Sequence, residues 1–474
     1  MTKEYDAVIV GAGPNGLAAA VTLAQAGRSV LVLEAADTPG GGARSMALIE
    51  ADVVHDICSA VHVLGVASPF FRSQPLERLG LEWVHPQIPL AHPLDHGRCA
   101  VAQSDLDTTV AALGVDGKAY RAIIGRLSRR FDDLADDVLG PVVHMPRHPI
   151  FFTRFGIQAV LPAAVLARRF STDEARALFG GCAAHAMLPF RSALTSSFGM
   201  LLLAGAHAHG WPFARGGSQQ IIDALVARLI ELDGRVECNR VVRTLDDVPP
   251  ARTTMFDTSP RQLAAIAGES LPARYRRRLE SFRHGPGAFK IDYVLDGPVP
   301  WTSLSCRSAG TVHVGGTIAE VAGAESAVAA GRHAEKPFVL VAQPTVVDDT
   351  RAPRGTHALW VYAHVPNGST LDKSEAIENQ IERFAPGFRD VVRARSVITA
   401  AQFEDYNANY VGGDIAGGAH AMSQLIARPF VSRHNYRTPN PRLFLCSAST
   451  PPGAGVHGMC GFNAARAALS TVLK

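Results

Sequence analysis

The chain lacks the cysteine spacing of a disulfide-rich or zinc-binding protein. It has seven cysteines in 474 residues, and no two of them are arranged as C-x-x-C. Scattered cysteines in odd number argue against a disulfide framework and a zinc site, and they favour a reducing compartment such as the cytoplasm. The missing C-x-x-C also counts against flavin enzymes that reduce disulfides. We therefore expect a cytoplasmic protein without a metal site.

Charged residues are also scarce. Asp, Glu, Lys and Arg make up 19% of the chain, against 47% hydrophobic residues, so a large buried interior is expected. The 46 Lys and Arg nearly balance the 43 Asp and Glu. The nearest approach to a basic tract, Arg274–Arg278, is interpreted as a solvated helix face. This balance argues against a nucleic-acid partner.

The sequence contains no clear membrane-spanning segment. Its start, MTKEYDAVIV, is too acidic and too poor in apolar length for a signal peptide. The longest uncharged run, 192–214, is interrupted by Ser, Thr, Gly, His and Trp-Pro, which predicts a buried helix followed by a turn. The apolar stretch Ile150–Phe170, flanked by Arg154, Arg168 and Arg169, fits peripheral contact with a membrane. A helix that covers a substrate cavity explains the same residues equally well.

A glycine loop near the start points to a nucleotide. The apolar, β-branched segment 5–10 is typical of a buried parallel strand, and it runs directly into GAGPNG, which fits G-x-G-x-x-G. A helix-forming segment ends at Gly27, and the strand after it ends with Glu34 and Ala35. Glu34 comes 18 residues after Gly16 (34 − 16), near the spacing of an acid that binds a ribose, and its charge disfavours a 2′-phosphate there. The loop residues predicted to contact the dinucleotide, with its pyrophosphate at the helix N-terminus, are Gly11, Gly13, Pro14, Asn15 and Gly16.

A second glycine cluster, DTPGGGARS at 37–45, follows the strand that carries Glu34. It would let the chain pass close to an extended cofactor, while a surface turn is the alternative. The candidate contacts are Gly40, Gly41, Gly42, Ala43, Arg44 and Ser45. The combination of G-x-G-x-x-G, the acid and a glycine turn ending in Arg-Ser resembles FAD enzymes of the amine-oxidase and phytoene-desaturase superfamily. The resemblance implies that the cofactor is FAD and not NAD.

The letters GAGVHG at 453–458 fit the same fingerprint near the other end of the chain. A strand precedes them, but TPP intervenes, and only 16 residues follow Gly458 (474 − 458). Because that leaves no room for a second strand with a ribose acid, this is not a second Rossmann unit. It resembles the C-terminal flavin motif of phytoene desaturases and carotenoid isomerases, in which a helix start stabilises the reduced flavin. The resemblance implies flavin contacts for Ser447, Gly455, Gly458 and Met459, although His457, Met459 and Cys460 depart from the small, apolar residues of carotenoid desaturases.

The resemblance covers nearly the whole chain and implies an α/β fold in which two domains are interleaved. A discontinuous Rossmann-type FAD-binding domain is expected from 1–90, 206–270 and 401–474. An α+β substrate domain, with helices on one face of an antiparallel sheet, is expected from 91–205 and 271–400. Within the FAD-binding domain, residues 235–245 alternate like a strand, and the resemblance implies that Val242 meets the adenine. Ordinary core packing of this valine is the alternative.

Lys290 stands inside the alternating segment 287–301. In a strand, Phe289, Ile291 and Tyr293 would share one face and leave Lys290 and Asp292 on the other. An exposed strand edge is one interpretation. The other follows from the resemblance to amine oxidases, which carry a strand lysine that holds a water near flavin N5 and takes part in catalysis.

Further candidates rest on position alone. His457 beside the flavin could act as an acid, a base or a hydrogen-bond donor, or it could simply pack or be solvated. His55 falls near the flavin by family position. Tyr406, Tyr410 and Asn407 are candidates for the lining of a substrate cavity, with loop packing as an equal alternative.

The sequence thus predicts an FAD-dependent oxidoreductase that desaturates a small apolar or lipid-like substrate by hydride transfer to flavin N5. Orientation over the flavin and a dry cavity suffice for such a step. The alternatives are C–N oxidation with O₂ as in amine oxidases, isomerisation on reduced flavin, and an FAD-binding scaffold without activity. The oligomeric state and the electron acceptor stay open.

Overall fold

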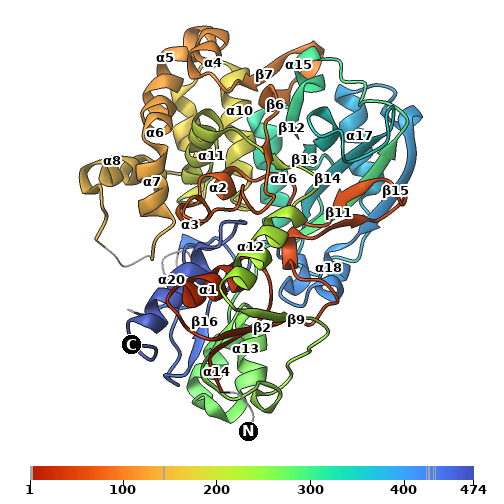
Figure 1. Ribbon diagram of the computed structural model, residues 1–474. Coiled ribbons are helices and arrows are strands. Elements are labelled where there is room, and N and C mark those ends of the chain that lie inside the picture. The colour runs from red at the N-terminus through yellow and green to blue at the C-terminus, as the bar shows by residue number, and fades with distance from the viewer. Residues whose placement is uncertain (1–3, 142–144, 423, 425–427, 431, 433) are drawn as a thin grey trace.

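The computed structural model describes residues 4–141, 145–422, 424, 428–430, 432 and 434–474. Its lower half in Figure 1 contains a sheet of five parallel strands in the order β16-β10-β1-β2-β9. The strands are β1 (Tyr5–Val10), β2 (Val30–Leu33), β9 (Arg235–Glu237), β10 (Ala251–Phe256) and β16 (Leu443–Leu445). β1, β10 and β16 come from the start, middle and end of the chain, so segments far apart in sequence form one sheet.

Two helices pack against the helix that follows the first glycine loop. α1 (Pro14–Gln25) follows β1 and is almost completely buried, because α12 (Gln219–Glu231) and α20 (Met459–Leu469) pack against it. At the α1–α20 contact, a Cβ added to Gly461 would lie 1.7 Å from the carbonyl oxygen of Asn15. Only glycine therefore allows this approach. α13 (Pro260–Ala267) and α14 (Ala273–Glu280) follow β10.

The strand expected over 235–245 is much shorter in the structure. β9 pairs only with Leu31–Leu33 of β2. Asn239 then takes a positive φ of 57°, and its N–H donates to the Ala36 carbonyl, which turns the chain away from the sheet. Val242 lies beyond this turn, half-buried between two apolar clusters.

A second sheet of seven strands forms the upper right of Figure 1, in the order β15-β11-β14-β13-β12-β6-β7. All its neighbours are antiparallel except the β6–β12 pair. Helix α17 (Ser374–Phe384) packs on the face formed by Phe289, Ile291 and Tyr293, and α16 (Ile318–Ala329) follows β12. The strands are β6 (Ile88–Pro93), β7 (Cys99–Ala102), β11 (Gly287–Leu295), β12 (Ala309–Val314), β13 (Val339–Ala342), β14 (His357–Val365) and β15 (Val392–Ile398). Because β11 lies between β14 and β15, the interpretation of Lys290 as an exposed edge residue is wrong.

Residues 106–209 are mainly helical. The predicted buried helix in 192–214 is α11 (Thr195–His209), which packs against α10 (Asp173–Ala184). The other helices of this region are α4 (Leu106–Ala112), α5 (Gly117–Tyr120), α6 (Arg126–Arg129), α7 (Phe131–Val138), α8 (Pro149–Ala159) and α9 (Ala163–Leu166). Short α2 (Val63–Val66) and α3 (Pro69–Arg72) connect the halves, with the small sheets β3 (Ser45–Ala47)–β4 (Val54–Asp56) and β5 (Trp83–Val84)–β8 (Phe213–Ala214).

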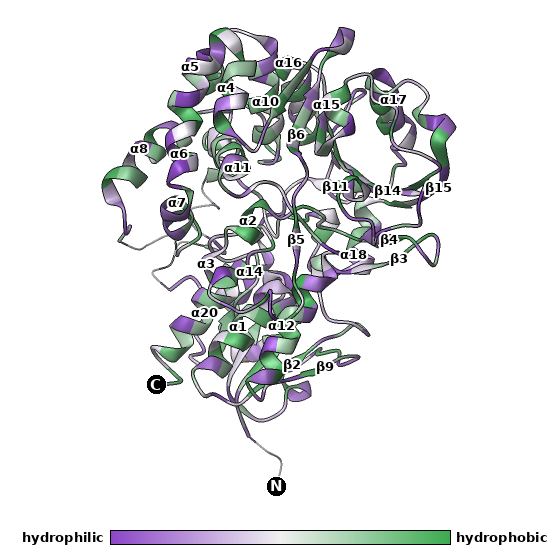
Figure 2. Ribbon diagram, turned by 45° about the horizontal axis from the view of Figure 1, so that its top comes forward, coloured by the Kyte–Doolittle hydropathy of each residue, from purple (hydrophilic) through white to green (hydrophobic). Residues whose placement is uncertain are grey.

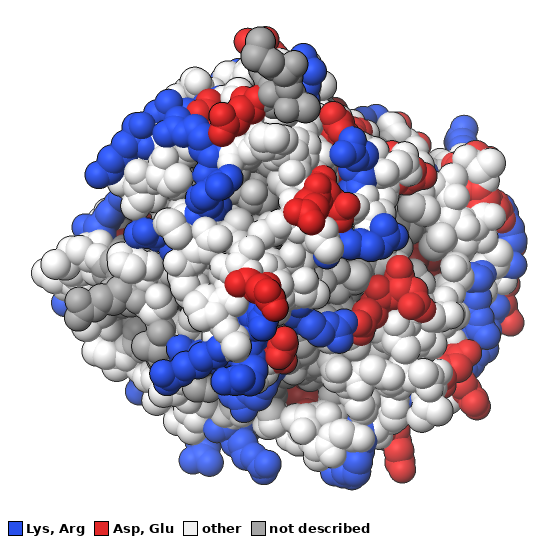
Figure 3. Space-filling model, turned by 90° about the horizontal axis from the view of Figure 1, so that it is seen from below, with Lys and Arg blue, Asp and Glu red and all other residues white. Residues whose placement is uncertain are grey.

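The surface agrees with the near balance of charge. Basic and acidic side chains are interspersed over the face seen in Figure 3. Helix α14, which carries the Arg274–Arg278 tract, exposes most of its arginines, as predicted. Within the described ranges, no one helix has both the length and the apolar composition to cross a bilayer; α8 and the segment 163–169 reach them only together, bent 91° apart. Figure 2 shows α8 with apolar residues at the edge of the molecule.

Candidate functional site

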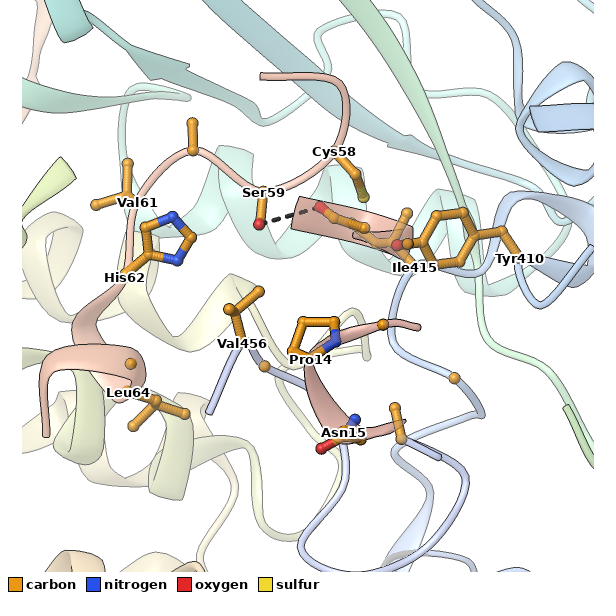
Figure 4. A pocket seen from close by; sticks show the side chains of 18 of the residues that line it. Pro14, Asn15, Cys58, Ser59, Val61, His62, Leu64, Tyr410, Ile415 and Val456 are labelled. Atoms are coloured by element: carbon orange, nitrogen blue, oxygen red, sulfur yellow. Dashed lines mark hydrogen bonds between the residues drawn. The ribbon is translucent and has the colours of Figure 1, made fainter. Parts of the chain in front are cut away.

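A cavity of about 350 Å³ lies where the two sheets meet. One end is formed by loops at the carboxyl ends of β1, β10 and β16, where open parallel sheets bind their ligands. Figure 4 shows Pro14 and Asn15 across this space from Cys58 and Ser59, with His62 on one side and Tyr410 on the other. The wall residues at the loop end are Gly13, Pro14, Asn15, Gly41, Gly42, Asp257, Ser447 and Gly455.

The first glycine loop has the geometry that its fingerprint predicts. Gly11 has a φ of +102°, which side chains rarely adopt. A Cβ on Gly16 would lie 2.1 Å from the Gly11 carbonyl oxygen, and one on Gly13 would lie 2.6 Å from Asp257 Oδ2. Pro14 occupies the first turn of α1, where a missing N–H costs nothing. The loop therefore brings backbone to the cavity at the positive end of the α1 dipole.

Asp257 was not among the predicted site residues. It follows β10, and its Oδ2 accepts a hydrogen bond of 2.8 Å from the Gly16 N–H. Burial raises the pKa of this carboxyl to about 7, and the charge of Glu34 acts in the same direction. Only the pairing of β10 with β1 brings it to the loop, so the signal in the sequence was a carboxylate directly after an apolar strand.

Glu34 lies at the end of β2 but not on the cavity wall. Its carboxylate accepts hydrogen bonds from the N–H groups of Ala12 and Ala36, at 2.8 and 3.0 Å, and pairs with Arg44 at 3.0 Å. Gly41 and Gly42 of the second glycine cluster line the wall. The other candidate residues of this stretch lie outside the cavity wall: Ala35, Gly40, Ala43, Arg44 and Ser45.

The C-terminal loop contributes Ser447 and Gly455 to the wall, next to the start of α1. Gly458 caps α20 with a φ of +69°, and a Cβ there would lie 2.9 Å from Ala18 Cβ. Gly458 therefore packs against α1, and Met459 is buried beside it. His457 is fully buried and outside the wall; its Nδ1 accepts a 3.0 Å hydrogen bond from the Met459 N–H. Burial lowers the pKa of His457 to about 4, so the imidazole is neutral at pH 7.

The other end of the cavity is largely aromatic and aliphatic. Strands β12, β13 and β14 present their inner face to it, and α10 and α11 close it. The residues at this end are His185, Leu202, Trp211, Thr311, Leu340, Ala342, Trp360 and Tyr362. Tyr410 and Asn407 line the middle of the cavity, whereas Tyr406 lies behind Gly41, to whose carbonyl its hydroxyl donates at 3.4 Å.

Ionisable groups on this wall are held neutral. Burial lowers the pKa of His62 to about 4 and that of His185 to about 3. His62 is also hydrogen-bonded to Ser218 Oγ at 2.8 Å. Burial raises the pKa of the Cys58 thiol and of the Tyr410 hydroxyl. At neutral pH these four side chains therefore place no charge in the cavity.

Lys290 is buried one strand beyond the wall. Its ammonium forms an ion pair with Asp292 and lies 5.8 Å from the ring centre of Trp360. Asp292 also lies 3.6 Å from His55 Nδ1. Lys290 faces Tyr362 in the β11–β14 register, so it is on the cavity side of the sheet, but it is not itself part of the cavity wall.

The sequence is similar to those of several known proteins. Residues 9–72 match the model of an NAD(P)-binding Rossmann-like domain. A mouse pyridine nucleotide-disulfide oxidoreductase domain-containing protein 2 is 24% identical over 98% of this chain and 93% of its own length. The lycopene-forming phytoene desaturase of a Paracoccus species is 24% identical over 96% of this chain and 95% of its own. The chain is thus similar along nearly its whole length to both of these proteins.

The fold of the chain is also that of solved oxidoreductases. Putrescine oxidase, in a structure with putrescine bound, aligns with a TM-score of 0.62 at 18% identity, over the full length of both chains. An oxidoreductase from Methanosarcina mazei aligns with a TM-score of 0.65 at 15% identity, over 98% of this chain and all of the other. The expected amine-oxidase-like α/β fold with a Rossmann-type domain is thereby confirmed.

Proposed function

We propose that the chain binds FAD and dehydrogenates a small apolar substrate. One observation carries the proposal: a single cavity runs from the two glycine loops to an aromatic and aliphatic wall on the second sheet. A cofactor held at the loops would therefore face a substrate held at the wall. Homology to phytoene desaturases supports the same chemistry.

The residues present fit FAD. Asn15 is buried on the wall, yet its Oδ1 has no hydrogen-bond partner. A Cβ on Gly41 would lie 3.3 Å from the Gly13 Cα, so the two glycine clusters enclose a space that side chains at these positions would narrow. The pyrophosphate would be held at Gly13–Gly16. The resemblance gives Glu34 for the ribose and Val242 for the adenine, and both lie outside the cavity wall. The ring would lie between Gly41–Gly42 and Gly455, with Ser447 beside it.

The chain's own residues would orient the substrate and keep water out. When bound, FAD supplies the acceptor for two electrons and a hydrogen from the substrate. The neutral state of His62, His185 and Tyr410 leaves the substrate end without a strong base. The C–H bond that is broken as a hydride needs no base for that step, because positioning and a dry cavity suffice. The C=C bond forms when the adjacent carbon also loses a proton, which the neutral imidazole of His62 or His185, or water, would accept. The aromatic and aliphatic wall favours an apolar molecule as the substrate.

Oxidation of a C–N bond with O₂ is the second candidate, and the fold of putrescine oxidase supports it. In that case Lys290 would be the most important side chain for catalysis. Because Lys290 is paired with Asp292 and lies outside the cavity wall, a water or a side-chain movement is required to connect it to the cavity. Isomerisation on reduced flavin and a scaffold without activity stay as alternatives that no contact of the described residues favours.

Peripheral membrane contact fits an apolar substrate. Ile150, Ile157 and Val165 are exposed on α8 and α9, close in sequence to Arg154 and Arg168. None of the residues 149–170 lines the cavity, so this apolar surface is free for another role. A small apolar molecule taken from a lipid phase is the substrate that this arrangement supports.

The test is anaerobic mixing of the FAD-loaded protein with panels of apolar polyenes, fatty acyl compounds and amines. Loss of the oxidised flavin absorbance with an apolar compound, and formation of a new C=C bond by mass spectrometry, is expected. Bleaching by amines alone, with hydrogen peroxide on return of air, would favour C–N oxidation instead. Mass spectrometry of lipid retained by the purified protein identifies the compounds to try first.

A further inference from the structure

The carboxyl of Asp257 lies inside the glycine loop that the proposed function assigns to pyrophosphate. Its Oδ2 accepts the Gly16 N–H at 2.8 Å and would lie 2.6 Å from a Cβ on Gly13. A Cβ added to Gly11 would lie 3.3 Å from the Cβ of Asp257. All three fingerprint glycines therefore surround this one side chain, which is 8% exposed and lines the cavity.

An ionised Asp257 conflicts with a bound pyrophosphate. The N-terminus of α1 offers its N–H groups and the positive end of its dipole to an anion. Asp257 already uses the Gly16 donor, and a carboxylate beside a phosphate is a like-charge contact in a poorly solvated place. The protonated acid has no such conflict, because its O–H donates to a phosphate oxygen.

We propose that Asp257 belongs to the phosphate site and acts there as a neutral acid, so that binding of the dinucleotide takes up one proton from solvent onto its carboxyl. The one bond formed is the O–H bond of the acid, and its proton comes from solvent. The inference rests on the proposed FAD binding and adds a residue and a pH dependence to it. A site built only from glycine backbone and the α1 N-terminus would bind with no proton uptake.

The groups around Asp257 allow its carboxyl to be protonated near neutral pH. Glu34, paired with Arg44, is the nearest carboxylate, and its charge favours the acid form of Asp257. On the other sides lie Cys446, after β16, and Cys460, at the start of α20. Burial raises the pKa of both thiols, that of Cys460 to about 12, so they stay uncharged at neutral pH. No titratable side chain of α1 faces the carboxyl, since its first turn is Pro14, Asn15, Gly16 and Leu17.

The sign of the pH dependence follows from linkage. A bound pyrophosphate raises the pKa of Asp257 above its value of about 7 in the free protein. Affinity is then full below about pH 7 and falls by up to about tenfold per pH unit above it, until the pKa of the complex is reached. The pyrophosphate of FAD has no titration of its own in this range, so the slope belongs to the protein.

The experiment measures the affinity of the protein, freed of flavin, for FAD and for ADP-ribose from about pH 6 to about pH 9. Calorimetry in buffers of different ionisation heat counts the protons taken up. We expect the slope with both ligands, because both contain the pyrophosphate. Asp257→Asn keeps a neutral donor and should bind both without a slope. Asp116→Asn, which alters another buried carboxylate far from the cavity wall, should keep the wild-type slope.

The possible failures are distinguishable. A wild-type affinity for FAD that does not change with pH overturns the inference and leaves FAD binding intact. The same slope in Asp257→Asn, or a slope with FAD but none with ADP-ribose, assigns the proton to another group and also overturns it. No binding of FAD at any pH overturns the proposed function, and the inference with it.

Discussion

Replacing Gly13 by alanine tests the geometry of the phosphate loop most simply. The φ of Gly13 is −74°, in a region that any residue adopts, so the substitution strains no backbone. Its effect is steric. The new Cβ would lie 2.6 Å from Asp257 Oδ2, about 0.8 Å closer than the 3.4 Å at which ordinary contact begins. The carboxyl must move away and lengthen its 2.8 Å hydrogen bond with the Gly16 N–H.

Two separate losses are expected. The free energy of unfolding should fall by about 1–2 kcal/mol, the worth of a hydrogen bond to a partly ionised buried group. FAD affinity should fall at least tenfold, about 1.4 kcal/mol, because the methyl group keeps the pyrophosphate from the backbone. Urea denaturation of the flavin-free protein measures the first quantity, and quenching of FAD fluorescence measures the second. Gly323→Ala, exposed on α16 with no atom within 4 Å of the new Cβ, is the control and should be neutral or slightly stabilising.

A double variant separates the two causes. Among the described residues other than its chain neighbours, only Asp257 has atoms within 4 Å of a Cβ at position 13, so Asp257→Ala should relieve the stability loss of Gly13→Ala. FAD affinity should stay low in the double variant, since the methyl group is still in the loop. If Gly13→Ala binds FAD within about twofold of the wild type, backbone contact with pyrophosphate at this position is refuted.

Three further predictions address other parts of the molecule. Lys290→Met leaves Asp292 buried without its lysine partner and should lower the free energy of unfolding by about 3 kcal/mol. An unchanged rate of flavin reoxidation in this variant would exclude Lys290 from oxygen chemistry. Burial lowers the pKa of His92 to about 4. The stabilising contribution of this neutral histidine to the free energy of unfolding is therefore fully present above about pH 6.5 and is lost as the pH falls towards 4, at about 1.4 kcal/mol per pH unit. Urea titrations should show a shallower acid slope in His92→Gln, and an unaltered slope would contradict this. Ile157→Asp should reduce co-sedimentation with anionic phospholipid vesicles several-fold, while Ile230→Asp, equally exposed on α12, should not; equal effects would argue against an α8 membrane surface.

Local patterns predicted the parts of the site that local geometry determines. The glycine loop, its strand and its helix follow from residues adjacent in sequence, since G-x-G-x-x-G between a strand and a helix allows one arrangement of backbone. The segregation of Phe289, Ile291 and Tyr293 from Lys290 and Asp292 follows from the two-residue period of a strand and is confirmed.

Long-range pairing determines what the sequence left undecided. An alternating strand has the same sequence pattern at the edge of a sheet as in the middle. Lys290 is buried because β15, about a hundred residues away in sequence, pairs with β11. The length of β9 depended on where its partner β2 ends. Asp257 became a site residue only because β10 pairs with β1, which no local pattern around Asp257 reveals.

The central claim is that the two glycine loops hold one FAD. The most direct measurement is the absorbance spectrum and flavin content of the purified protein, repeated after incubation with FAD. We predict one FAD per chain, released as intact FAD on denaturation, and an FAD affinity at least about tenfold lower in Gly13→Ala. A colourless protein that cannot be reconstituted with FAD, or one that takes up NAD in its place, would contradict the account.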